Sequence, residues 1–287
     1  MDNPLVSVVI PAYNRPHTLR IALDSALGQT HANLEVVICD DSSNDGVQEM
    51  IGDYLRADSR VRYYRNERNL FVGNWHKGFD LAKGDYINYL MDDDVFHPEK
   101  LERMLRFYRE FGDIALVTSY RQTINAAGQA LLPLQATARL YGETRIMAGR
   151  ALADYAMSRC LNVIGEPTTV LFRKADLTDK FGVFGGKQYT LLNDMAAWLH
   201  LLGKGRAVYM PETLSYFRLH PSQNNQTLGR TAFAEWLDLA VAARANGFLR
   251  DDAAYRSALE AFLGRIRGSA AFAEDAARAG EILRELD

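Results

Sequence analysis

The sequence predicts an α/β fold: a Rossmann-like, mostly parallel sheet flanked by helices, followed by a helical C-terminal extension. Short apolar runs rich in β-branched residues alternate with longer helical patterns through the first half of the chain. These runs are apolar throughout, as in strands that are covered on both faces. From about Thr231 onward the pattern is helical, with a break at Asn246 and Gly247.

Strand and helix signals follow one another in a regular order in the first half. Pro16 and Pro98 mark helix starts, and Gly112 marks a helix end. The predicted strands cover residues 5–12, 34–41, 61–65, 86–91 and 114–119. The predicted helices cover residues 16–30, 47–55, 73–82 and 97–112.

The pattern is less regular beyond residue 119. Residues 121–132 indicate a hairpin that turns at Ala127 and Gly128. Residues 205–220 predict two strands interrupted at Pro211, because proline cannot donate to a strand ladder. We also predict a helix over 150–159, a strand over 168–173 and a helix that begins near Asn193.

Composition excludes several classes of protein. The chain has 287 residues, 48% of them hydrophobic and 24% charged, which is typical of a globular domain. A net charge of −3 gives no indication of a nucleic-acid partner. The two cysteines, Cys39 and Cys160, have neither disulfide-framework nor metal-ligand spacing, so we expect a reducing, cytoplasmic setting. Neither a signal peptide nor an apolar run of about 20 residues is evident.

Three polar clusters follow predicted strands. They cover residues 11–15, 39–46 and 91–98. Because ligands of such sheets bind beyond the carboxyl ends of the strands, we expect the three clusters to face one crevice. Carboxylates repel a bare phosphate, and a divalent cation between them would reverse that effect.

In the same order, "VSVVIPAYNR", "LEVVICDDSSNDG", "DYINYLMDDDVFHPEKL" and "LLNDMAAWLH" resemble the family-2 nucleotide-sugar glycosyltransferases of the GT-A fold. The resemblance covers roughly residues 5–226. It implies transfer of a sugar from a nucleotide diphosphate to an acceptor with inversion, usually with Mg²⁺ or Mn²⁺. It also implies a GT-A catalytic domain over 1–226, with a nucleotide-binding half to about 119 and an acceptor-binding half after it, and a helical extension over 227–287.

By this resemblance, the first polar cluster and the Asp40–Asp41 pair bind the donor nucleoside. Asp41 is favoured for the base edge, because a carboxylate accepts a hydrogen bond from the N3–H of uracil or thymine. The alternative is that Asp40 and Asp41 only cap the following helix. The predicted donor-binding residues are Pro11, Ala12, Tyr13, Arg15, Asp40, Asp41, His76 and Asp92. His76 stands where many relatives have Asn.

The aspartate triplet has two possible registers against the family's D-x-D-D pattern. In the first register, Met91 replaces the usual first aspartate and Asp93 is the principal metal ligand. In the second register, residues 92–94 are themselves the D-x-D motif. We predict Asp93, Asp94 and His220 as metal ligands, with Asp94 alternatively a loop anchor and His220 alternatively structural. Oxygen ligands with positions left for diphosphate suit Mn²⁺ or Mg²⁺.

Asp194 matches the family's catalytic base, and the alternative is that Asn193 or Asp194 is only a helix N-cap. Glu166 and Trp198 are predicted to bind the acceptor, a glycan or lipid-linked molecule. Surface polysaccharide or glycoconjugate synthesis is the expected context, with UDP- or dTDP-sugars favoured as donors.

The alternatives are an inactive glycosyltransferase-like nucleotide-binding module and a sugar-1-phosphate nucleotidyltransferase. A nucleotidyltransferase would need a Gly-rich phosphate loop after the first strand, and the segment "PAYNRPHTL" at that place contains no glycine. A homodimer and a peripheral contact with the inner face of the membrane are left open. No nucleic-acid partner is expected.

Overall fold

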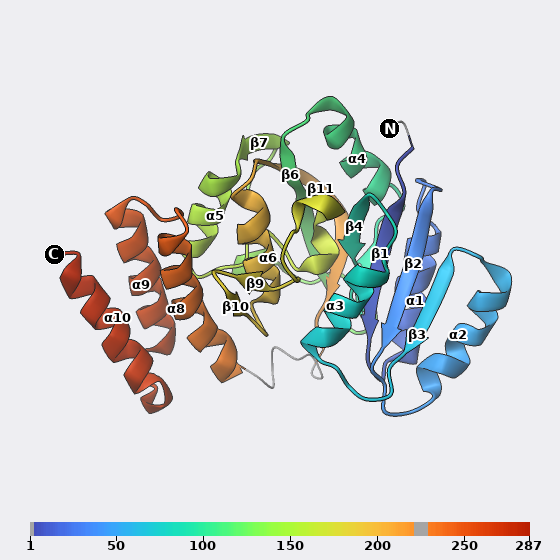
Figure 1. The fold of residues 1–287 in the computed structure, drawn as a ribbon, viewed down its shortest axis with the longest axis horizontal. Helices are drawn as coiled ribbons and strands as arrows, with labels where there is room; N and C mark the ends of the chain where they lie inside the picture. The colour runs from blue at the N-terminus through green and yellow to red at the C-terminus, as the bar shows by residue number, and fades with distance from the viewer. Residues whose placement is uncertain (1–2, 221–228) are drawn as a thin grey trace.

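The computed structural model describes residues 3–220 and 229–287, and within them a nine-stranded mixed sheet forms the centre of the molecule (Figure 1). Its path is β3-β2-β1-β4-β8-β6-β11-β5, with β7 paired to β11. The sheet strands are β1 Val6–Ala12, β2 Leu34–Asp40, β3 Val61–Arg65, β4 Tyr86–Tyr89, β5 Val95–Phe96, β6 Ile114–Ile124, β7 Arg145–Ala148, β8 Leu171–Arg173 and β11 Arg206–Arg218. β9 (Val183–Phe184) and β10 (Lys187–Gln188) form a separate hairpin.

The first four strands along the chain are parallel to one another, which confirms the Rossmann-like first half. β8 is antiparallel to both β4 and β6, and β11 is parallel to β6. The helices before β11 are α1 Pro16–Leu27, α2 Gly46–Ala57, α3 Val72–Leu81, α4 Lys100–Glu110, α5 Gly149–Met157 and α6 Asn193–Leu202. The predicted α/β class with a mostly parallel sheet is therefore confirmed.

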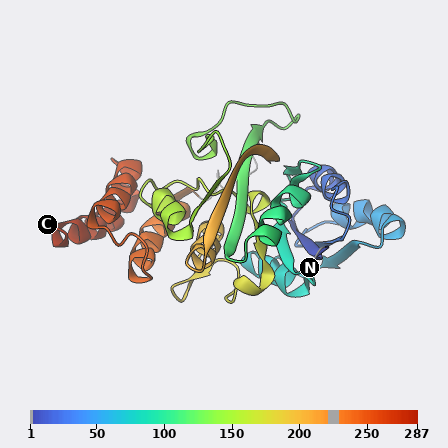
Figure 2. The same cartoon turned by 90° about the horizontal axis from the view of Figure 1, so that it is seen from above.

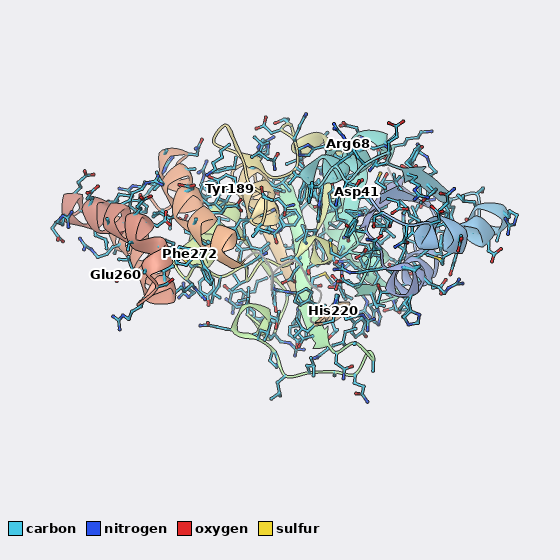
Figure 3. The ribbon with its side chains drawn as sticks, turned by 90° about the horizontal axis from the view of Figure 1, so that it is seen from below. Asp41, Arg68, Tyr189, His220, Glu260 and Phe272 are labelled. Atoms are coloured by element: carbon cyan, nitrogen blue, oxygen red, sulfur yellow. The ribbon has the colours of Figure 1, made fainter. Side chains whose placement is uncertain are left out.

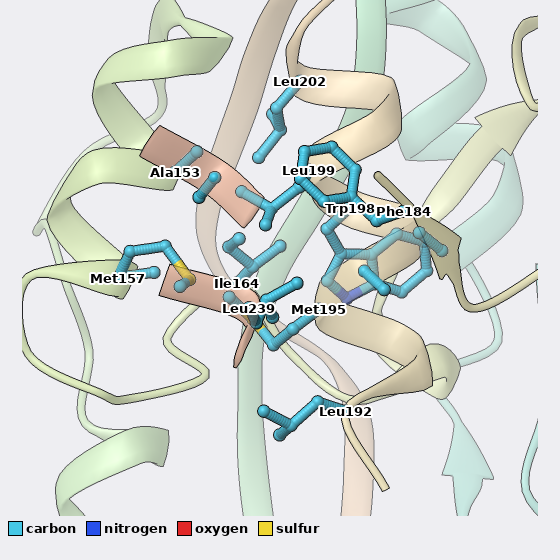
Figure 4. Close-up of a cluster of buried hydrophobic side chains, with 14 of the residues drawn as sticks. Ala153, Met157, Ile164, Phe184, Leu192, Met195, Trp198, Leu199, Leu202 and Leu239 are labelled. Carbon is cyan, nitrogen blue, oxygen red and sulfur yellow. The ribbon is translucent and has the colours of Figure 1, made fainter. Parts of the chain in front are cut away.

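Two apolar cores cover the two faces of the sheet. Successive residues of a strand point to opposite faces, so Val8 and Ile10 join the core under α1, α2 and α4, whereas Val9 joins the other. The second core surrounds α6, where Trp198 packs with Met195 and Leu199 (Figure 4). This core holds the helix that carries Asp194.

The C-terminal extension consists of α8 (Gly229–Ala245), α9 (Asp252–Ile266) and α10 (Ala273–Glu285). Figure 1 shows these helices at the end of the molecule opposite β3 and α2. They extend the core around α6, to which Leu239 and Phe262 contribute. The predicted domain boundary at residue 226 lies outside the described residues. No helix in residues 3–220 or 229–287 has the length and apolarity to cross a membrane.

Three predicted elements differ from the structure. β11 continues through Pro211 as one strand, because its register against β6 shifts between Met210 and Thr213 and so omits the proline from the ladder. The predicted hairpin at Ala127 and Gly128 turns as expected, but its return contributes only an isolated bridge between Ile124 and Ala130. The predicted strand over 168–173 begins only at Leu171, after a 3₁₀ turn over Pro167–Thr169.

Candidate active site

The three polar clusters meet at the carboxyl ends of β1, β2 and β4. The amide of Tyr13 donates to Asp92 Oδ2 at 3.0 Å, which joins the first cluster to the third. The amide of Asn14 donates to Ser42 Oγ at 2.8 Å, which joins the first to the second. Figure 3 looks onto this edge, with Asp41 and His220 on it. The shared edge predicted from the sequence is confirmed.

A cavity of about 510 Å³ lies beside the first two clusters. Tyr13, whose side chain is 45% exposed, and Asp41 both line it. Arg65, the last residue of β3, and Asn66 and Arg68, which follow it, line the cavity as well. Glu67 is a second carboxylate in the lining, so two acidic and two arginine side chains accompany the half-exposed ring of Tyr13. Such a mixed polar and aromatic lining suits a ring with an attached polar group.

Asp40 and Asp41 have different environments, and neither side chain caps α2, which begins at Gly46 after Asp45. Asp40 is fully buried and accepts hydrogen bonds from the amide of Ser42 and the hydroxyl of Tyr63. Asp41 accepts from Asn66 Nδ2 at 2.6 Å and from the amide of Leu70 at 3.0 Å. Burial raises the pKa of Asp41. Asp40 thus holds the loop together, whereas Asp41 lines the cavity.

Pro11 and Ala12 are buried at the end of β1, where the carbonyl of Ala12 accepts a hydrogen bond from the amide of Asp41 at 3.0 Å. They position the Tyr13 loop against the second cluster. His76 is not among the residues that line the cavity, and its Nε2 lies 3.0 Å from the carbonyl of Phe181.

The aspartate triplet is buried. Arg15 Nη1 lies 2.9 Å from Asp92 Oδ1 and 3.3 Å from Asp93 Oδ2, so the guanidinium bridges the first two carboxylates. His220 Nε2 lies 2.8 Å from Asp93 Oδ2. Asp94 is directed into the fold, where Thr168 Oγ1 donates to Oδ2 at 2.5 Å and the amide of Arg218 donates to Oδ1 at 2.9 Å. The surroundings of Asp94 match its predicted alternative as a loop anchor.

The chemistry of the triplet fits a cation. Burial, and then the neighbouring charge of Asp93, raise the pKa of both Asp92 and Asp94 above the ordinary range of aspartate. In residues 3–220 and 229–287, no group of three or more His, Cys, Asp or Glu side chains is arranged to hold a metal ion. Asp93 and His220, which lie 2.8 Å apart, could supply two protein ligands. Further ligand positions would fall to oxygens of a bound diphosphate or to water.

Asp194 lies in the first turn of α6, and the residue that precedes this helix is Leu192, so Asp194 is not the N-cap. Its Oδ2 accepts from Asn162 Nδ2 at 2.7 Å, and its Oδ1 accepts from the amide of Met195 at 2.6 Å. Burial raises the pKa of Asp194 to about 7. A carboxylate with such a pKa is suited to accept a proton near neutral pH.

The segment 162–169 connects Asp194 to the aspartate triplet. Asn162 at one end of the segment binds Asp194, and Thr168 at the other binds Asp94. Between them, Glu166 pairs with Arg121, whose Nη2 donates to Oε1 at 3.1 Å and whose Nε lies 2.5 Å from Oε2 without hydrogen-bond alignment. The structure thus brings Glu166 to the surroundings of Asp194, as a partner of Arg121.

The prediction that Trp198 contacts an acceptor is wrong for this structure. Its ring is fully buried, and its Nε1 donates to the carbonyl of Gly165 at 2.9 Å. Phe172 and Phe181 pack edge-on against it. Trp198 lies about one helical turn after Asp194 on α6, but its side chain points into the core.

Sequence reasoning missed several residues of this region. Arg65 ends the third strand, Asn66 and Arg68 follow it, and the rule that singled out polar clusters at strand ends would have found them as well. Asn162 gave no local signal, because only the packing of α6 against the segment 162–169 brings it to Asp194.

The fold and the arrangement of strand-end carboxylates define a glycosyltransferase of the nucleotide-sugar type with a GT-A fold. The chain belongs to glycosyl transferase family 2, whose family model matches residues 7–156. It is 29% identical to the putative teichuronic acid biosynthesis glycosyltransferase TuaG of Bacillus subtilis, over 81% of this chain and 86% of that one.

Two solved structures share the fold. TarS of S. aureus, solved in complex with UDP-GlcNAc, superposes with a TM-score of 0.68 at 18% identity, covering 98% of this chain and 81% of that one. The mannosyltransferase PcManGT of Pyrobaculum calidifontis, in complex with GDP-Man and Mn²⁺, gives 0.61 at 14% identity over 98% and 81%. The chain spans between 20% and 67% of the length of three other curated relatives, all uncharacterized glycosyltransferases.

Proposed function

We propose that the chain is a metal-dependent, inverting glycosyltransferase that transfers a sugar from a UDP- or dTDP-sugar to a hydroxyl group of a glycan or lipid-linked acceptor. Surface polysaccharide or glycoconjugate synthesis is the proposed context, supported by the name of the relative TuaG. The observation that carries the proposal is the contact of Tyr13 with Asp92, because it places the cavity lined by Asp41 directly beside the aspartate triplet.

The base of the donor belongs in the 510 Å³ cavity. Tyr13 offers a ring face, and each oxygen of Asp41 has a lone pair beyond the one used by Asn66 or Leu70. A carboxylate accepts from the N3–H of uracil or thymine. The complexes of TarS with UDP and UDP-GlcNAc support this choice of donor, whereas PcManGT was solved with GDP-Man.

The diphosphate belongs beside Arg15, Asp92 and Asp93. Asp93 and His220 would hold the cation, with Asp92 and Arg15 orienting the donor. A bound Mn²⁺ or Mg²⁺ supplies stabilisation of the negative charge on the leaving diphosphate. Asp194 removes the proton from the acceptor hydroxyl group, and attack on the face opposite the leaving group inverts the anomeric carbon.

Calorimetric titration with UDP, dTDP and GDP, each with and without Mn²⁺, tests the proposal together with an assay for donor hydrolysis and transfer. We expect metal-dependent binding of UDP or dTDP that Asp41→Asn weakens. Asp53→Asn, at an exposed position on α2, is the matched control and should bind as the wild type does. Binding without any turnover would instead identify an inactive nucleotide-binding module, and no binding of any nucleotide would refute the donor site.

A further inference from the structure

The connection between β6 and β7 carries an exposed, uncharged segment, residues 126–135, which we name the apolar loop. Every one of these residues is exposed. Leu132 is 88% exposed and Leu134 is 48% exposed, and Leu131 and Pro133 accompany them. No charged residue occurs between Arg121 and Arg139. Figure 2 shows this connection, in green, projecting from the body of the molecule.

The root of the apolar loop is fixed to the edge of the sheet that holds the aspartate triplet. Arg218 Nη1 donates to the carbonyls of Asn125 and Ala126 at 3.0 and 3.1 Å. The Nε of the same arginine donates to the carbonyl of Asp93 at 2.7 Å. The apolar tip therefore has a fixed position relative to the active site, and Figure 3 shows the loop on the same side as His220.

A cavity of about 440 Å³ opens between the root of the loop and α1. Its walls are apolar at Ile21, Val95 and Tyr216, and they carry the cationic or protonatable side chains of His17 and Arg218. Among the described residues that line it, none is acidic. The cavity thus combines apolar contact with cationic side chains, and Ala126, Ala127 and Gly128 of the apolar loop line it.

Positively charged side chains follow the apolar loop along the chain. Arg139 is exposed and lies over the ring of Tyr120, and Arg145 lies over the ring of Tyr141. Glu143 is the one acidic residue between Asp113 and Asp154. An apolar tip followed by tyrosine and arginine is the order that a segment needs to pass from acyl chains through the interface to anionic headgroups.

We propose that the apolar loop docks on an anionic lipid bilayer, with Leu131, Leu132 and Leu134 inserted and with the exposed side chains of Arg139 and His17 facing the headgroups. The loop projects from the body of the molecule, and a bilayer yields to a projecting apolar element. Docking would turn the edge that holds Asp93 toward acceptors carried at the membrane surface. The docking itself does not depend on the proposed function.

Co-sedimentation with vesicles tests the proposal. The probes are vesicles of phosphatidylcholine with phosphatidylglycerol, and vesicles of phosphatidylcholine alone. The full chain should sediment with the anionic vesicles, and the double variant Leu132→Asp/Leu134→Asp should bind at least about tenfold more weakly. Leu55→Asp, which replaces a leucine of 45% exposure on α2, is the matched control and should retain binding.

Two further measurements separate docking from misfolding and from self-association. The double variant should keep the thermal melting curve of the wild type and its hydrolysis of donor in solution, because both replaced side chains are exposed and neither belongs to a core cluster. Failure of the wild type to bind anionic vesicles, or equal binding by the double variant, would overturn the proposal. A change of sedimentation coefficient in the double variant without vesicles would show that the loop joins two copies of the chain instead.

Discussion

The carboxylate of Glu235 on α8 accepts a hydrogen bond at 2.8 Å from the amide of Leu192, the residue that precedes α6. It also accepts from the amides of Thr190 and Leu191, at 2.8 and 2.9 Å. The amides at the start of a helix lack partners within the helix. Here a buried carboxylate from the C-terminal extension binds the amides of the three residues that precede α6. The extension therefore anchors the beginning of the helix that carries Asp194.

Replacement of Glu235 should accordingly affect both stability and catalysis. Glu235→Ala leaves three amide groups without their acceptor, and we expect it to lower the free energy of unfolding by about 2 kcal/mol or more. We also expect kcat to fall more than the affinity for donor, since the start of α6 is displaced and the nucleotide cavity is not. Urea unfolding and steady-state kinetics measure the two effects. Glu260→Ala, exposed on α9, is the control, and an equal loss in both variants would contradict this role.

Asp194 and Asp93 should give separable defects. Asp194→Asn removes the proposed base and should reduce transfer by about 10²- to 10⁴-fold while donor binding is retained. Asp93→Ala removes a proposed metal ligand and should weaken metal-dependent donor binding itself. Calorimetry of donor binding with and without Mn²⁺, combined with transfer rates, distinguishes them. The reverse pattern would exchange the two roles.

The rate of transfer should depend on the ionisation of Asp194. Because a base acts only when it is ionised, kcat should rise with pH through the pKa of Asp194, which burial raises to about 7. Loss of the Asn162 hydrogen bond in Asn162→Ala should raise that pKa and move the acidic limb to higher pH. Glu166→Gln removes a negative charge and frees Arg121 to act on Asp194, so it should move the limb to lower pH. The same direction of shift in both variants would rule out Asp194 as the titrating group.

Lys100 should make stability depend on pH. Its Nζ is fully buried, donates to the carbonyl of Thr169 at 2.8 Å and lies over the ring of Phe96. Burial holds the pKa of Lys100 well below the ordinary range, so between that lowered pKa and about pH 10 the folded state binds fewer protons than the unfolded state. Stability should therefore rise with pH, by up to about 1.4 kcal/mol per pH unit, until the unfolded pKa is reached. Urea unfolding at several pH values should show this component in the wild type and not in Lys100→Met, and parallel profiles would disprove it.

The strand-end rule explains how much of the site could be predicted. It found Tyr13, Asp41 and Asp93 because parallel strands with apolar sequences end at one edge, so polar residues after them must meet. It could not locate Asn162, which binds Asp194, or Glu235, which binds the amide of Leu192 just before α6, because neither lies in a motif of its own. Helical periodicity placed Trp198 on α6 correctly, but whether a residue of a helix faces the core or a cleft depends on what packs against it. The strand through Pro211 was missed because a register shift depends on the neighbouring strand.

The sequence by itself determined the family, the order of strands and helices in the first half, and the clustering of carboxylates at one edge of the sheet. These follow from local periodicity and from the fixed geometry of parallel strands. Only the tertiary structure decided which partners each aspartate of the triplet has. Asp92 and Asp93 lie beside Arg15, whereas Asp94 is bound by Thr168 and Arg218. Three adjacent carboxylates are alike in sequence, and their environments differ because the partners of each arrive from segments more than 70 residues away.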